Sequence, residues 1–157
     1  MGTLELEIRR ESLGSPAAVA LIDALDAELL TLYPEDGTAE HFRLQAAEVE
    51  HGRGAFFVAY MREKPVACGA VRMLDAKTAE VKRMYVDPAA RKMGIGRRIL
   101  AMLEAEARTL GATSMVLETG PRQPEAIGLY ASAGFTKIPA FGEYPDPDLS
   151  VFMGKNL

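Results

Sequence analysis

Apolar residues alternate with polar ones at the start of the chain and then recur at helical spacing. Leu4, Leu6 and Ile8 alternate with polar residues, which predicts a strand over about residues 3–10. Ser15 as N-cap and Pro16 at the first helical position predict a helix start. That helix has apolar residues three and four positions apart, at Val19, Ile22, Leu25, Leu29 and Leu32.

A second helix is expected over residues 38–50, after the break at 33–37 and before Gly52 and Gly54. Three apolar runs follow, at 55–61, 66–74 and 79–86, separated by short polar turns. Short turns between successive strands predict an antiparallel meander.

The next segment predicts a crossover. A helix begins near Gly96 and repeats apolar residues to Leu110, and Thr113 to Thr119 then form a strand. A strand, a helix and a strand in this order favour two parallel neighbouring strands, here 79–86 and 113–119. A further helix opened by Pro124 and two short strands complete a mixed α/β sheet flanked by helices, expected as one domain over residues 1–157.

Composition narrows the class of protein. The chain has 157 residues, 48% apolar and 25% charged, with a net charge of −4, which is typical of an ordinary globular protein. The absence of a basic block argues against nucleic acid as a partner, and no apolar run approaches the ~20 residues of a membrane span. One cysteine permits no internal disulfide, which fits a cytoplasmic location.

The loop 91–96 is the strongest chemical signal. Gly94 and Gly96 stand between a strand and a helix, and basic residues surround them: Arg91, Lys92, Arg97 and Arg98. A helix N-terminus with unpaired N–H groups, glycines and positive charge is suited to a phosphate or diphosphate. The dinucleotide fingerprint fails because Ile99 stands where its third glycine is required, and no nucleotide triphosphate loop is present.

Two motifs together resemble the GNAT superfamily of N-acetyltransferases. The first is Arg-x-x-Gly-x-Gly at 91–96, after a strand that ends in Val86-Asp87-Pro88. The second runs from Gln123 through Ala126 and Leu129-Tyr130 to Gly134-Phe135, at the spacing and in the order of the family. Lys92 stands where the family often has glycine, and Gln123 where it usually has asparagine.

The resemblance implies a sheet that splays between its two central parallel strands and holds acetyl-CoA, as cosubstrate, in the resulting V. It implies coenzyme contacts from the strand end, the glycine loop and the following helix, at Met84, Tyr85, Val86, Arg91, Lys92, Met93, Gly94, Ile95, Gly96, Arg97 and Gln123.

Acetylation of an amine benefits from a base, because an alkylammonium with pKa ~10.4 must lose a proton before it attacks. Glu80 begins the strand that leads to the loop, and Glu118 ends the parallel strand beside it. Each resembles a catalytic glutamate of a GNAT subgroup, and the sequence does not choose between them. Either could also be a solvated carboxylate at a strand end.

Tyr130 resembles the family tyrosine that protonates the departing thiolate; the alternative is a helix tyrosine that packs its ring in the core. Backbone N–H groups near Met84 to Val86 are candidates for stabilising the oxyanion, because strand splay leaves such groups unpaired. Cys68 lies among small apolar residues and is expected to be a buried structural thiol. His41 and His51 lack the spacing of a zinc site, so no metal is expected.

These observations favour an acetyl-CoA-dependent N-acetyltransferase that acts on a primary amine by direct attack in a ternary complex. The alternative is a non-catalytic acyl-CoA binding or sensing module on the same fold. The acceptor, a small molecule or a peptide, is not identified. The loops 33–43 and 139–149 are acidic and predict a cationic acceptor, and a homodimer is conceivable.

Overall fold

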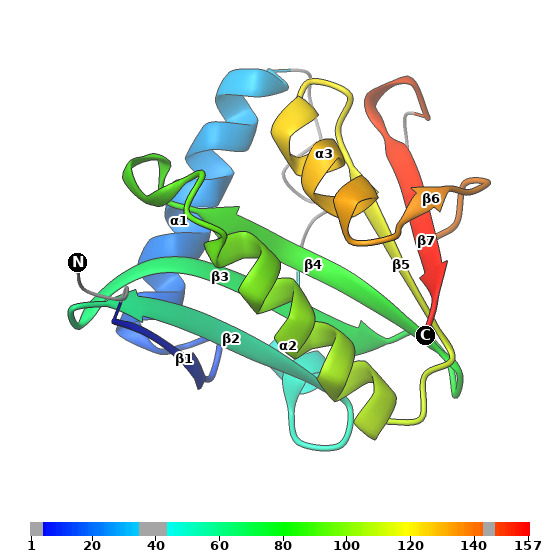
Figure 1. Cartoon of the computed structure of the whole chain (residues 1–157), viewed down its shortest axis with the longest axis horizontal. Helices are drawn as coiled ribbons and strands as arrows, with labels where there is room; N and C mark the ends of the chain where they lie inside the picture. Colours follow the sequence, from blue (N-terminus) through cyan, green and yellow to red (C-terminus); the bar gives the residue numbers. More distant parts are fainter. Residues whose placement is uncertain (1–4, 35–43, 143–146) are drawn as a thin grey trace.

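The described residues form one mixed sheet of seven strands in the order β1-β2-β3-β4-β5-β7-β6 (Figure 1). The structure is a computed structural model in which residues 5–34, 44–142 and 147–157 are described. The strands are β1 Leu6–Arg10, β2 Gly54–Met61, β3 Lys64–Met73, β4 Thr78–Val86, β5 Ser114–Thr119, β6 Thr136–Lys137 and β7 Val151–Asn156. The helices are α1 Pro16–Leu32, α2 Ile95–Thr109 and α3 Pro124–Ser132, with short 3-10 turns at Ala46–Val49, Pro88–Ala90 and Pro147–Leu149.

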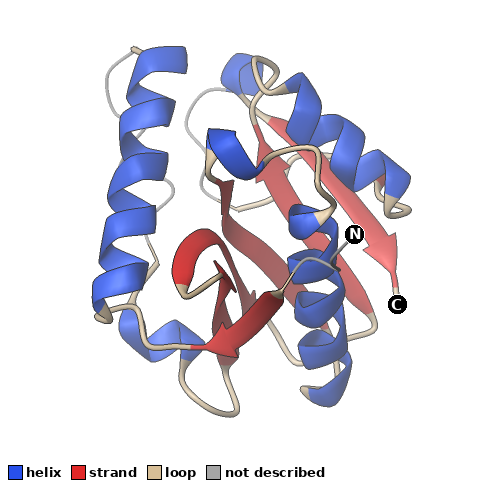
Figure 2. Cartoon of the chain, turned by 60° about the vertical axis from the view of Figure 1, so that its left-hand side comes forward, coloured by secondary structure: helices blue, strands red, loops and turns tan. Residues whose placement is uncertain are grey.

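Helices cover both faces of the sheet (Figure 2). α1 packs its buried residues Leu21, Leu25 and Leu29 on one face, against Phe56 and Val58 of β2. On the other face, α2 and α3 enclose the larger apolar cluster. The periodic residues of α2 are buried as predicted, because an amphipathic helix turns its apolar stripe to the sheet.

The predicted meander and crossover are confirmed. β1 to β4 pair antiparallel in sequence order, and β4 pairs parallel with β5. The β4–β5 pairing runs only from Thr78–Ser114 to Val81–Leu117, although β4 continues to Val86. The two strands diverge beyond that point, so the sheet splays between them (Figure 1).

A bulge in β4 lies where the splay begins. The register with β3 shifts between Cys68 and Ala70, and Arg83 has φ 58, in the left-handed region. A bulge turns the following side chains to the opposite face. Lys82 therefore shares the α1 face with Glu80, whereas Met84 packs with the α2 cluster.

Two predictions of detail are wrong. The expected helix over 38–50 is, where it is described, a short 3-10 turn at Ala46–Val49, and residues 38–43 lie outside the described residues. Val19 was expected on the buried face of α1, but its side chain is 46% exposed. Ala18 is buried instead, because its small side chain lets the helix approach the sheet closely.

Candidate active site

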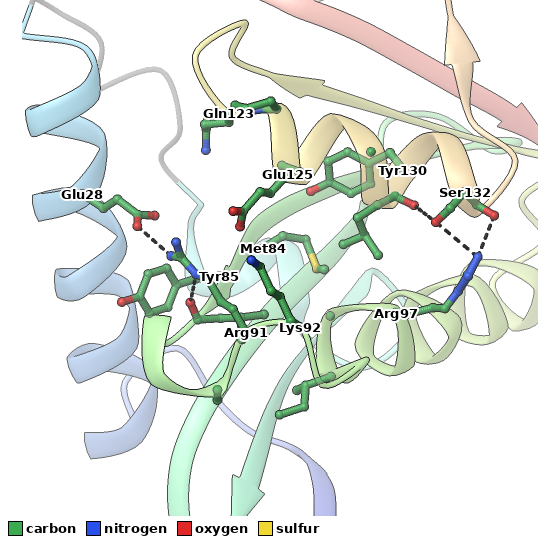
Figure 3. A pocket seen from close by; sticks show the side chains of 18 of the residues that line it. Glu28, Met84, Tyr85, Arg91, Lys92, Arg97, Gln123, Glu125, Tyr130 and Ser132 are labelled. Atoms are coloured by element: carbon green, nitrogen blue, oxygen red, sulfur yellow. Dashed lines mark hydrogen bonds and ion pairs between the residues drawn. The ribbon is translucent and has the colours of Figure 1, made fainter.

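A large cavity opens at the splay, between α1, the end of β4, the start of α2, and α3 (Figure 3). Its volume is about 880 Å³. This size is in the range of protein sites that hold cofactor-sized ligands. Its walls include every residue predicted to bind coenzyme except Met93, whose side chain is 39% exposed and lies outside the wall.

The glycine loop provides an anion site at the first turn of α2. Gly94 is the N-cap and has φ 80, a conformation that glycine adopts without strain. The Arg98 N–H donates to the Gly94 carbonyl at 3.2 Å. The amides before it, of Ile95, Gly96 and Arg97, belong to the first helical turn, which helix geometry leaves without internal acceptors.

Gly96 is needed for a different reason. A Cβ at this position would lie 3.2 Å from the Leu129 Cδ2 atom and 3.5 Å from the Val86 Cγ2 atom. The glycine therefore lets the start of α2 pack directly against α3 and the end of β4. This contact holds the N-terminus of the helix at the cavity.

The basic residues of the loop have distinct partners. Arg91 donates from Nε to the Val86 carbonyl at 2.8 Å and pairs with Glu28 of α1 at 2.6 Å. Arg97 donates to the Ser132 carbonyl at 2.6 Å, which ties α2 to the end of α3. Lys92 has φ 66, which explains why a glycine would suit its position.

Gln123 lies at the start of α3 and faces both the cavity and α1. Its Oε1 atom accepts from the Gly120 N–H at 3.2 Å and from the Tyr33 hydroxyl at 3.4 Å. Because the carbonyl oxygen has these partners, the amide nitrogen is the end that can donate to a ligand. Glu28 of α1 was not predicted as part of this region, since no local pattern links α1 to the Arg91 loop about sixty residues later.

A second, smaller cavity of about 70 Å³ adjoins the first on the α1 face of the sheet. Both cavities share Met84, Gln123, Ala126 and Tyr130 in their walls. The smaller one is completed by Leu25 and Leu29 of α1, Val81 to Arg83 of β4, and Glu118 and Thr119 of β5. A ligand bound in the large cavity could therefore meet a second molecule at this shared wall.

Tyr130 lies where the cavities meet. Its side chain is buried, and its ring packs edge to face against the Phe135 ring, with the two ring centroids 5.9 Å apart. Burial, with a smaller contribution from the Glu118 charge, raises the pKa of its hydroxyl above the usual value. The phenol therefore stays protonated and available as a donor. Figure 3 shows it on α3, close to Met84 of β4.

Glu118 faces the smaller cavity with one oxygen unused by the described residues. The Ser150 hydroxyl donates to its Oε2 atom at 2.6 Å, while Oε1 is buried without a hydrogen-bond partner among the described residues. Burial raises the pKa of the carboxyl to about 7, and the Glu80 charge adds to this, against the Ser150 hydrogen bond and the Lys82 charge. A carboxylate with this pKa is well matched to accepting a proton at neutral pH.

Glu80 has a different environment. Its side chain is 1% exposed, and Arg72 donates to its Oε1 atom from Nε at 2.9 Å. Arg72 also pairs with Glu48. As the described residues outline them, neither cavity has Glu80 in its wall. The structure therefore brings Glu118 and Tyr130 together but holds Glu80 in a buried ion pair behind them.

The remaining candidates have no catalytic setting. Cys68 is fully buried, and burial raises the pKa of its thiol to about 12, so it is a poor nucleophile. Within residues 5–34, 44–142 and 147–157, no group of three or more His, Cys, Asp or Glu side chains could hold a metal ion. His41 lies outside these ranges. None of the helices in the described part of the chain is long and apolar enough to cross a membrane.

Two curated relatives match most of the chain or nearly all of it. The IAA acetyltransferase of Azospirillum brasilense is 42% identical over 152 residues, which are 96% of this chain and 97% of the relative. The uncharacterized N-acetyltransferase YsnE of Bacillus subtilis is 31% identical over 119 residues, covering 73% of this chain and 79% of that protein.

Solved structures of other proteins also resemble this chain over nearly its whole length. A protein of Klebsiella pneumoniae, provisionally named an acyl-CoA N-acyltransferase, has a TM-score of 0.81 at 34% identity and covers 98% of each chain. Two more distant structures share the fold and were determined with the coenzyme. The Elizabethkingia anophelis acetyltransferase with acetyl-CoA bound has a TM-score of 0.67 at 18% identity, covering 97% of this chain and 98% of that one. The Thermoplasma acidophilum PaiA N-acetyltransferase in complex with coenzyme A has a TM-score of 0.73 at 16% identity, with 98% and 100% covered.

The family model of the acetyltransferase (GNAT) family matches residues 22–135. This range includes most of α1, the meander, the glycine loop and all of α3. It therefore contains both motifs on which the resemblance rested. This chain belongs to the GNAT family of acetyltransferases.

Proposed function

We propose that this protein is an acetyl-CoA-dependent N-acetyltransferase that acetylates a primary amine by direct attack in a ternary complex. The observation that carries the proposal is the placement of Glu118 and Tyr130 on the walls of the smaller cavity, where it meets the large one. The large cavity would hold acetyl-CoA, with its diphosphate at the first turn of α2. The smaller cavity would hold the amine.

In this mechanism Glu118 is the base. The amine nitrogen attacks the thioester carbonyl carbon, and Glu118 takes its proton directly or through a water. The negative charge then develops on the carbonyl oxygen. Those backbone N–H groups from Met84 to Val86 that point away from β3 would stabilise it, because β4 has no β5 partner over these residues.

Tyr130 would protonate the leaving group. The C–S bond breaks, the tetrahedral intermediate collapses to the acetylated amine, and the coenzyme leaves as a thiol with the Tyr130 proton. Proton exchange with solvent or with Glu118 restores the phenol. Glu80 is not the base in this proposal; its charge instead helps to keep the pKa of Glu118 near neutrality.

Release of free thiol from acetyl-CoA, measured with a panel of primary amines, tests the function. We expect turnover that depends on the amine, with the acetylated product seen by mass spectrometry. The intact protein should show no acetyl adduct, because Cys68 is buried. Binding of acetyl-CoA without turnover across the panel would instead support a binding or sensing module. A cytoplasmic location remains part of the proposal.

A further inference from the structure

The smaller cavity has two buried polar atoms whose hydrogen-bonding capacity the described residues do not satisfy. Among the described residues, two buried side-chain atoms have no hydrogen-bond partner: Glu118 Oε1, an acceptor, and Arg83 Nε, a donor. Both residues lie in the wall of the same cavity. Buried polar atoms are nearly always hydrogen-bonded, so two such atoms at one cavity indicate groups that a bound molecule satisfies.

Arg83 is held rigidly at this wall. The left-handed conformation of the β4 bulge places it there, and its side chain is 6% exposed. One terminal nitrogen, Nη1, pairs with Asp26 of α1 at 2.7 Å. This pair fixes the guanidinium in place and leaves Nε–H to donate to another oxygen.

Lys82 adds a second cation to the same wall. Its side chain is buried on the α1 face of the sheet, and it lines the smaller cavity. Burial lowers the pKa of its ammonium, although the nearby Glu80 charge opposes this. An anionic oxygen in the cavity would favour the charged lysine and offset the cost of its burial.

We infer that the acceptor is a small primary amine that also carries a carboxylate a few bonds from the nitrogen, as in a free amino acid. This inference rests on the proposed function. The amine would donate to Glu118 Oε1, and the carboxylate would accept from Arg83 Nε and pair with Lys82. The cavity volume of about 70 Å³ suits the amine and carboxylate of one small molecule, and Leu25 and Leu29 offer apolar contact to its side chain.

This class differs from the purely cationic acceptor that the acidic loops 33–43 and 139–149 predicted. Most of the acidic residues behind that prediction lie outside the described residues. The described walls of the cavity instead combine one carboxyl with two cations. They match an acceptor with both charges.

Matched sets of acceptors test the inference with the unmodified full-length protein. Each set has one side chain in three forms, for example leucine, leucinamide and 3-methylbutylamine. The amide retains the carbonyl oxygen but not the charge, and so represents a peptide N-terminus. The kcat/KM for thiol release is compared after correction for the fraction of neutral amine, since the three nitrogens differ in pKa.

We expect kcat/KM for the amino acid to exceed kcat/KM for the two forms that lack the carboxylate by about 10- to 100-fold. This is the range for hydrogen bonds to charged groups. The preference should be strongest for one or a few side chains. An amide or a decarboxylated amine that reacts as well as the acid, in every set, would overturn the inference while leaving the acetyltransferase intact. No thiol release with any amine would overturn the proposed function itself.

A variant pair locates the effect. In Lys82→Met the ratio of acid to decarboxylated amine should fall toward one, mainly through a higher KM for the acid. Lys77→Met is the matched control, because Lys77 is exposed in the turn before β4 and does not line the cavity as the described residues outline it. An unchanged ratio in folded Lys82→Met would contradict the assignment of Lys82, and the acceptor sets alone decide if this variant does not fold.

Discussion

At the scale of single residues, the structure gives different surroundings to two candidates for the base that the sequence left equivalent, Glu80 and Glu118. Glu80, Glu118 and Tyr130 were each either catalytic or structural by pattern alone. All three side chains are largely buried, but the partners of the two glutamates differ. Glu80 is paired with Arg72, whereas one oxygen of Glu118 has no hydrogen-bond partner among the described residues and its side chain lines a cavity. No local pattern could reveal this, because Arg72 and Ser150 reach these glutamates from other strands or segments.

Tyr130→Phe removes only a hydroxyl and keeps the ring contact with Phe135. If Tyr130 protonates the thiolate, kcat should fall about 10²- to 10⁴-fold, while acetyl-CoA affinity changes little. Steady-state kinetics and calorimetry measure the two effects. If the variant keeps full turnover and the alkaline limb of its pH–rate profile is unchanged, Tyr130 is not the acid and only packs in the core.

Glu118→Gln tests the base through pH dependence. With a pKa of about 7, the carboxyl must lose its proton to act, so the unmodified rate should rise with pH through this value. The variant should lose this rise of the rate with pH, and its rate at neutral pH should be about 10²- to 10⁴-fold lower. The rate should recover partly at high pH, where more of the amine is neutral. Glu80→Gln is the comparison and should retain the rise, shifted to lower pH, because one negative charge near Glu118 is gone. Loss of the rise in Glu80→Gln alone would reverse the assignment.

The same carboxyl should also affect stability. Its folded pKa is raised, so its contribution is fully present below the unfolded value of 4.5 and is lost as pH rises through about 7. Glu118→Gln cannot ionise and should therefore gain stability relative to the unmodified protein above pH ~7, by up to about 3 kcal/mol. Thermal unfolding between about pH 5 and 9 measures this. A difference in Tm that does not grow with pH would contradict the raised pKa.

At the scale of elements, most of the fold follows from periodicity, and the site follows from the motifs. The meander, α2, β5 and α3 were predicted because each has a clear apolar period or a proline or glycine boundary. The helix over 38–50 was not confirmed, since its few apolar residues also suit a short turn that packs only Val49. The β4 bulge was not predicted, because Arg83 has no sequence signal for a left-handed conformation.

The first turn of α2 yields a prediction about charge. Gly94 has positive φ, and nothing lies within 4 Å of the point that a Cβ would occupy there. Asn and Asp both tolerate this conformation and have the same shape, so they differ only in charge. Gly94→Asp should weaken acetyl-CoA binding by about 10-fold or more, and Gly94→Asn by much less, because the diphosphate would meet a carboxylate. Equal acetyl-CoA affinities of the two variants in calorimetry would show that the diphosphate does not bind at this turn.

At the scale of the whole molecule, α1 connects the separate parts of the site. Glu28 pairs with Arg91 of the glycine loop, and Asp26 pairs with Arg83 of the bulge. The Tyr33 hydroxyl accepts from the Arg122 N–H at 2.9 Å, which joins the end of α1 to the loop before α3. The helix thus spans the open end of the splay and contacts both sides of it.

This arrangement places an acidic residue where an anion is expected to bind. Glu28 lines the large cavity, and its carboxylate accepts a hydrogen bond from Nη2 of the Arg91 guanidinium. Glu28→Gln removes that charge and leaves Arg91 free to pair with the diphosphate, while its Nε bond to the Val86 carbonyl remains. We expect acetyl-CoA affinity to rise about two- to fivefold at low salt. The free protein should lose ~0–1 kcal/mol of stability, because the lost ion pair is partly open to solvent.

Glu125→Gln is the matched control for this prediction. Glu125 also lines the large cavity, from the first turn of α3, so its loss removes a carboxylate from the wall without releasing Arg91. A larger gain for Glu28→Gln than for Glu125→Gln would assign the difference to Arg91. Weaker binding in Glu28→Gln would mean the opposite, that the pair with α1 holds Arg91 in its binding position, and that the coenzyme binds to a loop already fixed by that helix.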